Sequence, residues 1–408
     1  MQTNLADFIK NTREGDEADS ILRKCVHCGF CTATCPTYQL LGDELDGPRG
    51  RIYLIKQVLE GKPATEKTQL HLDRCLTCRS CETTCPSGVQ YGRLLDIGRK
   101  VVDAQVPRSF PQRVVRGALK ELLPRRWVFR PAMKTAQLLR PWLPKALKNK
   151  VSIVQNEGAW PENRHPRKML LLEGCVQPSM APNINAATAR VLDALGVSVI
   201  VAANAGCCGA LRYHLNDQDG GLDDMRRNVD AWWPHVVAGV EAIVMTASGC
   251  GVTVKEYEHL LAHDAAYAVR ARRISELTRD LSEILPEFEK SLAKRMGGKI
   301  GQRIAYHPPC SLQHGQQIRG KVEDLLRALG VDVKLCADSH LCCGSAGTYS
   351  VMQPELANRL RDDKLKNLAA TNSAMIVSGN IGCLLHLQAG TGVPVRHWIE
   401  LIDGVLSA

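Results

Sequence analysis

Two cysteine runs of the same spacing near the N-terminus constrain this chain more than any other feature. The first is CVHCGFCTATCP, from Cys25 to Pro36, and the second is CLTCRSCETTCP, from Cys75 to Pro86. Gaps of two residues allow three thiolates of one tight loop to reach three irons of a cubane, while the fourth cysteine points elsewhere. The pattern predicts a small domain built around two 4Fe–4S clusters.

The last cysteine of each run determines how the two clusters share their ligands. In two-cluster ferredoxins this cysteine ligates the other cluster. We therefore assign the first cluster to Cys25, Cys28, Cys31 and Cys85. We assign the second cluster to Cys75, Cys78, Cys81 and Cys35. The alternative is a pair of tetrahedral zinc sites, but zinc in its usual arrangement would use only four of these eight thiolates.

The remaining nine of the seventeen cysteines all lie beyond residue 174. Eight of them form two constellations in which the central pair precedes a glycine: Cys175, Cys207, Cys208, Cys250 and Cys310, Cys342, Cys343, Cys383. The first three members of each set are 135 residues apart and the last members are 133 apart. With the matching segments ARVLDALGVSV and EDLLRALGVDV, this spacing predicts an internal duplication. Cys336 has no counterpart, and we predict a buried thiol there.

The hydrophobic pattern changes along the chain. Apolar residues within 50–62 and 91–104 have helical spacing. From residue 166 onward, buried strands such as KMLLLEGC and RIAYHPPC alternate with helices, which is typical of a mostly parallel sheet. We predict an α+β fold, with an N-terminal α-helical ferredoxin-like domain followed by a duplicated α/β cysteine-rich domain. The predicted segments are 1–105 (ferredoxin-like), 106–165 (basic connector), 166–295 (repeat 1) and 296–408 (repeat 2).

The connector carries almost all of the chain's net charge of +10. Residues 106–150 contain twelve Lys or Arg and one acid, Glu121. Its prolines should divide it into short helices, and Pro234 should bend or interrupt a helix of repeat 1. Three interpretations of the connector stay open: a solvated face, a dock for an acidic partner, or an anchor on an anionic membrane surface, which interleaved Trp residues suit. Nucleic-acid binding is disfavoured because no known module accompanies the charge.

The cysteines of the two constellations follow predicted strands, where α/β sheets place ligand sites. They are candidates for an additional metal or redox site, and buried apolar thiols are the alternative. His307, in YHPPC, could ligate a metal or move protons, although a lone histidine beside a strand end is more often structural. We find no dinucleotide-binding fingerprint, no Ser-His-Asp arrangement and no paired carboxylates, so we assign no catalytic residue.

The N-terminal segment is polar and lacks the plan of a secretory signal, and no apolar run approaches the ~18 residues of a membrane-spanning helix. We therefore expect a cytoplasmic chain whose thiols stay reduced.

The tandem motifs and the repeated Cys-Cys-Gly resemble a known family, the iron–sulfur subunits of flavin-linked hydroxyacid dehydrogenases. The resemblance is closest to glycolate oxidase (glycolate dehydrogenase) iron–sulfur subunits, through CVHCGFCTATCPTYQLLGDELDGPRGRIYLIKQVLEG and HLDRCLTCRSCETTCPSGV, and it extends over most of the chain. Subunits of glycerol-3-phosphate dehydrogenase, lactate-utilisation proteins and heterodisulfide reductase have the same layout. In the last of these a fifth cysteine completes each repeat, whereas this chain has Ala247 and Asn380 there.

The resemblance implies an electron-transfer subunit of a hetero-oligomeric complex. An FAD-binding partner would oxidise a 2-hydroxy acid, and the resemblance favours glycolate, which is oxidised to glyoxylate. This chain would relay the electrons to an acceptor such as a quinone. The implied cofactors are two 4Fe–4S clusters, a further iron–sulfur cluster in the repeats, and a flavin on the partner. The basic connector adds the expectation of peripheral contact with the inner face of the membrane. The alternatives are a lactate or glycerol-3-phosphate dehydrogenase subunit and a thiol or disulfide enzyme acting at the repeats.

Overall fold

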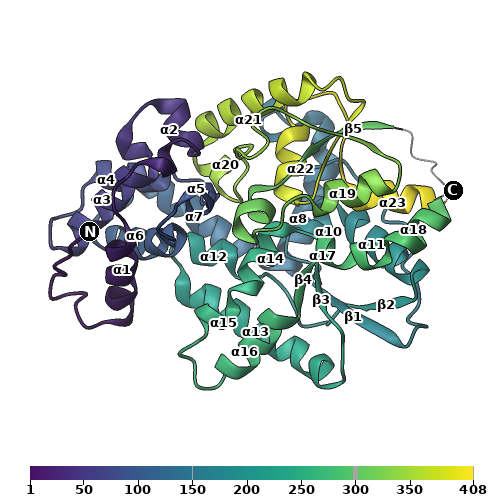
Figure 1. Ribbon diagram of the computed structural model, residues 1–408, viewed down its shortest axis with the longest axis horizontal. Coiled ribbons are helices and arrows are strands. Elements are labelled where there is room, and N and C mark those ends of the chain that lie inside the picture. Colours follow the sequence, from purple (N-terminus) through teal and green to yellow (C-terminus); the bar gives the residue numbers. More distant parts are fainter. Residues whose placement is uncertain (149, 297–301, 408) are drawn as a thin grey trace.

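The computed structural model describes residues 1–148, 150–296 and 302–407. Its N-terminal part is a lobe of short helices around the two cysteine loops (Figure 1). Its helices are α1 (Arg13–Lys24), α2 (Pro36–Leu41), α3 (Pro48–Leu59), α4 (Glu66–Asp73), α5 (Ser80–Thr84) and α6 (Tyr91–Gln105). Pro36 and Pro48 each open a helix, a position where the missing N–H costs nothing. Gly98 permits close packing of α6 on α3, since a Cβ there would lie 2.6 Å from Ile55.

The connector forms two main helices on the outside of the molecule. They are α7 (Phe110–Leu122) and α8 (Arg126–Leu139), followed by the single turn α9 (Lys145–Lys148). Our expectation of short pieces was wrong for α8, which runs for 14 residues with Pro131 inside it. Pro131 lies on the exposed side of the helix, where water can satisfy the carbonyl that loses its partner. Pro234 likewise lies inside a continuous helix, α13.

Repeat 1 contains a four-stranded parallel sheet in the order β2-β1-β3-β4. Its strands are β1 (Arg167–Leu171), β2 (Val197–Ile200), β3 (Ile243–Met245) and β4 (Thr278–Asp280). Its helices are α10 (Gln177–Met180), α11 (Pro182–Ala194), α12 (Ala210–His214), α13 (Gln218–Val237), α14 (Ser248–Lys255), α15 (Tyr257–Leu260), α16 (Ala268–Leu277), α17 (Leu281–Ile284) and α18 (Glu289–Met296). The strands are buried because helices cover both faces of a parallel sheet.

Repeat 2 has the same topology, with its parallel strands in the order β6-β5-β7-β8. The strands are β5 (Arg303–His307), β6 (Asp332–Leu335), β7 (Met375–Ser378) and β8 (Val395–His397). The helical elements are the π-helical turn η5 (Ser311–Gly315), α19 (Lys321–Ala328), α20 (Tyr349–Met352), α21 (Pro354–Ala369), α22 (Ile381–Gln388) and α23 (Trp398–Leu406). The matching strand orders confirm the predicted duplication. Sequence patterns missed β4 and β8, which have only three residues each.

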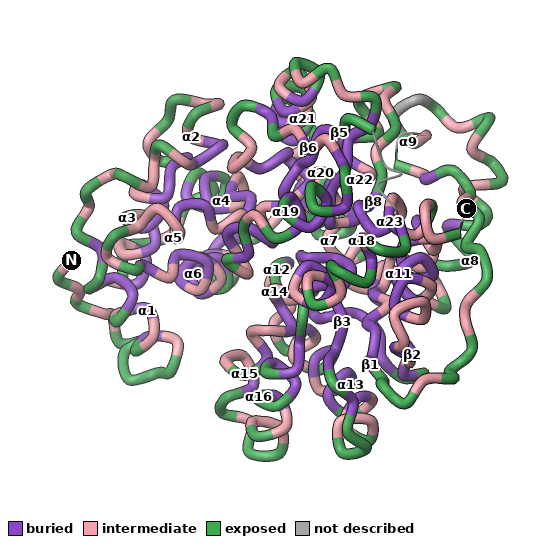
Figure 2. Tube along the Cα trace, turned by 45° about the vertical axis from the view of Figure 1, so that its right-hand side comes forward, coloured by how far each residue is buried: buried purple, intermediate pink, exposed green. Residues whose placement is uncertain are grey.

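The two repeats share one hydrophobic core. A single cluster of buried side chains runs from Met169 of β1 to Ile402 of α23. At this junction α11 packs on α23, and Arg190 forms a 2.7 Å ion pair with Asp403. Figure 2 shows the buried trace concentrated on the strands and α11, while α8 is mostly exposed. Among the described residues no helix is long and apolar enough to cross a membrane.

Candidate metal centres

Both cysteine loops of the N-terminal lobe have the same unusual backbone. The second residue after the first cysteine has a positive φ in each loop, 57° at His27 and 52° at Thr77. The residue after the second cysteine does too, 84° at Gly29 and 59° at Arg79. Non-glycine residues rarely adopt this conformation, and such strain collects at ligand sites. The repeated conformation shows that the two runs build the same kind of loop.

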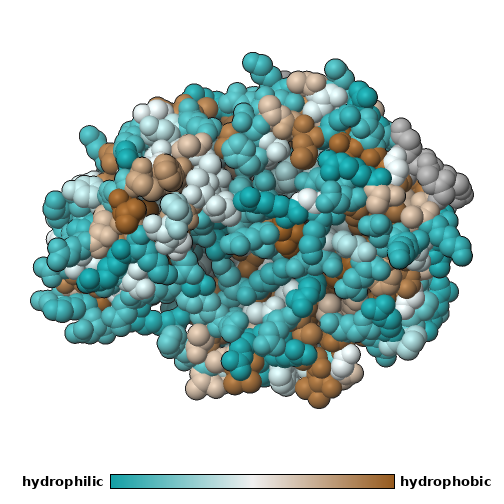
Figure 3. All heavy atoms as spheres, in the orientation of Figure 1, coloured by the Kyte–Doolittle hydropathy of each residue, from teal (hydrophilic) through white to brown (hydrophobic). Residues whose placement is uncertain are grey.

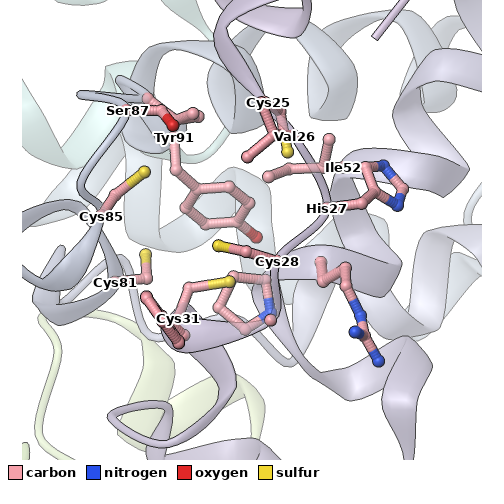
Figure 4. Close-up of a pocket in the computed structure, with 15 residues that line it drawn as sticks. Cys25, Val26, His27, Cys28, Cys31, Ile52, Cys81, Cys85, Ser87 and Tyr91 are labelled. Atoms are coloured by element: carbon pink, nitrogen blue, oxygen red, sulfur yellow. The ribbon is translucent and has the colours of Figure 1, made fainter.

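The first loop closes around a hollow of about 440 Å³ that includes its solvent-filled mouth. Figure 4 shows the thiols of this site around the ring of Tyr91. The cysteines that line the hollow are Cys25, Cys28, Cys31, Cys81 and Cys85. Cys85, which ends the second run, therefore lies beside the first three cysteines of the first run. This is the arrangement that the crossed assignment of the fourth ligand requires.

The protonation of these thiols indicates what kind of group fits between them. Burial, together with the neighbouring Cys25, Cys28 and Cys85, raises the pKa of the Cys31 thiol to about 11. Four thiolates this close repel one another unless a cation lies between them, and iron is such a cation. The donor set is soft sulfur throughout, which favours an iron–sulfur cluster over harder metals.

The second loop converges with the end of the first in the same way. Burial raises the pKa of the Cys81 thiol, and so do the nearby thiols of Cys78, Cys75 and Cys35. Cys35 is the fourth cysteine of the first run, and it is buried beside Thr37, with 3.3 Å between Sγ and Oγ1. The geometry therefore brings together the four residues assigned to the second cluster.

A buried ion-pair network supports this second site. Asp46 is fully buried and pairs with Arg74 at 2.8 Å and with Arg51 at 3.5 Å. Arg51 also donates to Thr37 Oγ1 at 3.1 Å, and Thr37 Oγ1 donates to the Asp46 carbonyl at 2.8 Å. Since Thr37 contacts the Cys35 sulfur, the network fixes the position of that thiol.

Repeat 1 gathers its four cysteines at the carboxyl end of its sheet. Cys175 follows β1, and Cys250 lies in α14 just beyond β3. β1 and β3 are the two neighbouring strands at which the strand order reverses, and parallel sheets place their ligand sites at this point. Hydrogen bonds from Cys175 and Cys208 lower the pKa of the Cys207 thiol. Hydrogen bonds with Cys207 and Cys250 raise the pKa of the Cys208 thiol. All four thiols thus form one connected group, which is suited to a metal.

Repeat 2 repeats this arrangement. Cys310 Sγ lies 3.8 Å from Cys342 Sγ, and Cys343 and Cys383 are close enough to hydrogen bond. The glycine after the cysteine pair is required here: Gly344 has a φ of 87°, and a Cβ would lie 2.5 Å from the Ala357 carbonyl oxygen. Asn380, which stands where some relatives have a fifth cysteine, donates to Cys383 Sγ at 3.6 Å. Gly209 plays the same part as Gly344 in repeat 1, with a φ of 90°.

The second ferredoxin-type site lies directly against the repeat 2 site. Desolvation raises the pKa of the partly buried Cys78 thiol, and the nearby thiol of Cys310 raises it further. Leu76, Cys342 and Tyr349 belong to one buried cluster, which Cys78 and Cys310 border. Thr83 Oγ1 lies 2.9 Å from His314 Nδ1 across the same junction. The ion pair of Arg79 with Glu256 at 2.5 Å ties the second loop to repeat 1 as well.

Several residues at these sites gave no clear signal in the sequence. Tyr91 lines the first hollow, but one aromatic residue after a cysteine run has no distinctive spacing. Asp46 and Arg51 lie in a polar stretch that looks solvent-exposed until the fold buries it. Cys336 is buried, as predicted, in an apolar cluster that also contains Cys343 and Cys383.

Comparison with known proteins decides the family. A cysteine-rich domain model matches residues 169–255 and 304–388, and a 4Fe–4S dicluster domain model matches residues 21–89. The glycolate oxidase iron-sulfur subunit of Escherichia coli is 55% identical to this chain, over 100% of this chain and 99% of its own length. The chain belongs to the family of glycolate oxidase iron–sulfur subunits. The predicted resemblance and the predicted α+β fold are both confirmed.

Other relatives share parts of this layout. The probable glycolate oxidase iron-sulfur subunit of Bacillus subtilis is 30% identical over 94% of this chain and 91% of its own length. Lactate utilization protein A of Bacillus licheniformis is 24% identical over 58% of this chain and 99% of its own length. Iron–sulfur clusters are the cofactors of this family, and the converging thiols of the N-terminal lobe fit them. The chain is therefore an electron-transfer protein.

Proposed function

We propose that this chain is the subunit of a glycolate-oxidising complex that takes electrons from a flavoprotein partner and passes them to an acceptor such as a quinone. The 55%-identical relative is a glycolate oxidase iron-sulfur subunit, which supports glycolate as the substrate. The main support for an electron relay is the contact between the second ferredoxin-type site and the repeat 2 site, through Cys78 and Cys310. The flavin belongs to the partner, where the substrate would also bind.

The site residues define an order from the surface to the interior. Cys28 is exposed, whereas Cys35, Cys75 and Cys81 are buried. We assign Cys25, Cys28, Cys31 and Cys85 to the outer cluster, and Cys75, Cys78, Cys81 and Cys35 to the inner one. Clusters held there would supply one-electron transfer. The protein residues hold these groups near one another and exclude water from the inner site.

We propose that the flavoprotein docks over the outer site. The exposed apolar side chains around Cys28 include Val26, Phe30 and Tyr53, which are 68%, 61% and 46% exposed. Figure 3 shows apolar atoms gathered on part of the surface of this lobe. Apolar side chains that surround an exposed redox site favour a protein partner that brings its own cofactor close.

The eight cysteines of the two repeats are proposed to hold additional metal, with four thiols in each repeat. Buried thiols that hydrogen bond to one another in a chain fit a thiolate metal site better than separate core positions do. We also propose the segments 1–105, 106–165, 166–295 and 296–408 as the functional divisions of the chain. The family models match within the first, third and fourth of them.

A thiol or disulfide reductase acting at the repeats is the second candidate function. Among the described residues the repeat thiols are mostly buried, and a hydrogen bond from Asn380 occupies the Cys383 sulfur. A substrate disulfide would need an exposed attacking thiolate. The structure therefore supports the electron relay better. A relay in a lactate or glycerol-3-phosphate complex would use the same sites with a different partner.

Activity of the assembled complex tests the proposed function. The full chain, co-purified with its flavoprotein subunits, should catalyse glycolate-dependent reduction of a quinone analogue. Replacing Cys78→Ser should lower this rate at least tenfold, because the serine hydroxyl is a poor ligand for iron. Cys336→Ser is the control, since Cys336 is a buried thiol that belongs to none of the assigned sites. Equal rates for the two variants would refute the relay.

A further inference from the structure

His307 is a buried imidazole that makes no hydrogen bond through its ring. Its side chain is 0% exposed, and neither Nδ1 nor Nε2 has a hydrogen-bond partner among the described residues. A buried imidazole without a partner is unfavourable, and native proteins rarely retain one without a reason. This observation calls for a partner that is not a protein atom.

The ring of His307 points into the cysteine site of repeat 2. One ring nitrogen of His307 and the sulfur atoms of Cys343 and Cys383 all lie within 4.8 Å of one another. His307 is the last residue of β5, and its carbonyl accepts a 2.7 Å hydrogen bond from Ser378 Oγ of β7. The backbone is therefore fixed, and the imidazole projects beyond the carboxyl end of the strand.

Other buried histidines of this part of the chain are satisfied. His314 bonds to the His340 carbonyl at 2.8 Å, His386 to the Ala357 carbonyl at 3.1 Å, and His397 to the Thr246 carbonyl at 3.0 Å. Each of these rings has an evident structural role. His307 differs from them because neither ring nitrogen has a hydrogen-bond partner among the described residues, while two thiols lie within 4.8 Å of one of these nitrogens.

The two repeats differ at this position. The 135-residue offset of the cysteines places Leu172 opposite His307, and Leu172 is a buried apolar residue packed in the core. At this position repeat 1 therefore has an apolar side chain, whereas repeat 2 has an imidazole beside its thiols. A structural role at the end of the strand can be filled by leucine, so the imidazole is present for another reason.

We propose that His307 is a metal ligand, and that it binds through one ring nitrogen a transition metal that Cys343 and Cys383 also hold. Thiolate and imidazole together suit iron and zinc. Where imidazole replaces thiolate on the iron of a cluster, the reduction potential rises. Repeat 2 would then hold a mixed site that differs in chemistry from the thiolate site of repeat 1. The inference rests on the proposal that the repeats bind metal.

Metal analysis of the full chain, purified without oxygen, tests this inference. The wild type should contain metal beyond the about eight irons of two 4Fe–4S clusters. His307→Leu, which introduces the residue of repeat 1, should lose at least half of this additional metal. His386→Leu is the matched control, a buried histidine of the same repeat, and should retain it. His307→Cys, which restores a ligand, should also retain it.

Spectroscopy can then detect the bond between the histidine nitrogen and the metal. In protein labelled with [15N]histidine, pulsed EPR should show a strongly coupled nitrogen if the metal is iron, and X-ray absorption should show a nitrogen ligand if it is zinc. The nitrogen signal should vanish in His307→Leu and in His307→Cys and persist in His386→Leu. The inference fails if the wild type contains no additional metal, or if additional metal and its spectrum are unchanged in His307→Leu.

These readouts are independent of turnover. If the chain did not serve a glycolate-oxidising partner, the activity assay would fail for every variant while the metal content still responded to His307.

Discussion

Asp46 is the residue on which the inner cluster site most depends without contributing a ligand. Its carboxylate is fully buried and meets Arg51, Arg74 and the Nδ1 atom of His71, the last at 3.0 Å. Arg51 is itself 1% exposed, so its charge has no access to water. A buried charge of this kind is tolerated only while its partner is present.

Asp46→Asn should therefore destabilise the chain strongly. Removing one partner of a buried pair typically costs about 3–5 kcal/mol. The urea midpoint of the anaerobically purified protein should fall accordingly, and iron should be lost first from the inner site beside Cys35. Asp43→Asn is the control, because Asp43 is exposed and caps a short helix, a role that asparagine fills equally well. A midpoint unchanged in Asp46→Asn would contradict the role of the network.

At this scale the sequence was informative where spacing carries the chemistry. The loops that bring Cys85 to Cys25 and Cys35 to Cys75 follow from a repeated motif, and their crossing could be expected from the two runs alone. Asp46 and Tyr91 could not be identified in that way, and the sequence offered His307 only as a lone histidine that is more often structural. Their importance depends on burial and on which thiols the fold brings near them, and neither property is visible in the local sequence.

Short elements join the two repeats at their common junction. His397 ends β8 and caps α23, where its Nδ1 accepts from the Ile399 amide at 3.2 Å. Its Nε2 reaches the Thr246 carbonyl beyond β3 of the other repeat at 3.0 Å. Burial lowers the pKa of His397 to about 3, and the bond to Thr246 only partly opposes this shift.

This buried histidine makes stability depend on pH. In the unfolded chain the imidazole takes up a proton below a pH of about 6.5, whereas in the folded chain it does so only near pH 3, so stability falls as pH drops below 6.5. Between pH 7.5 and 5.5 the wild type should lose about 1 kcal/mol more than His397→Asn does. Urea unfolding at the two pH values measures the difference, and asparagine preserves the helix cap. Identical pH slopes would show that His397 is not buried in this form.

The regular elements were predictable to the extent that they are long. The helices of 50–62 and 91–104 and the strands before Cys175 and Cys310 appear where hydrophobic spacing places them. β4 and β8 could not be predicted because three residues are too few to show a pattern of alternating hydrophobic residues. The prediction that Pro131 would end a helix was wrong. It assumed that the carbonyl that loses its hydrogen bond to the proline would be buried, whereas water can reach it on the exposed side of α8.

The N-terminal lobe, repeat 1 and repeat 2 contact one another through polar as well as apolar side chains. Arg108 and Arg116 of the connector pair with Asp73 at 2.6 and 3.1 Å, and Arg126 pairs with Glu173 at 2.6 Å. Part of the basic charge that looked available for a partner is therefore used to join the lobes. Sequence could count these charges but could not pair them, because their partners are distant along the chain.

The outer face of α8 is the part of the connector that stays available. Trp127, Arg130, Lys134 and Leu138 are all exposed and recur at the spacing of one helical face. Trp142, which is 78% exposed, follows the helix. Tryptophan with basic residues suits an anionic membrane surface, where each Lys or Arg contributes roughly 1 kcal/mol.

We expect the full chain to bind vesicles that contain one-third phosphatidylserine and to bind neutral vesicles much less. Replacing Trp127→Ser and Trp142→Ser together should weaken binding at least fivefold in a sedimentation assay, and added salt should weaken it further. The control is Trp232→Phe, since Trp232 is buried in repeat 1. If binding were the same for neutral and anionic vesicles and unchanged in the double tryptophan variant, α8 would not be the membrane-binding surface.

The central claim is that electrons from glycolate enter this chain. Rapid-freeze EPR of the complex with its flavoprotein subunits, mixed anaerobically with glycolate, tests it most directly. We expect signals of reduced 4Fe–4S clusters to appear after mixing, Cys78→Ser to remove the signal of the inner cluster, and Cys336→Ser to leave both signals. Reduction of the partner's flavin with no reduction of either cluster would show that electrons from glycolate do not enter this chain.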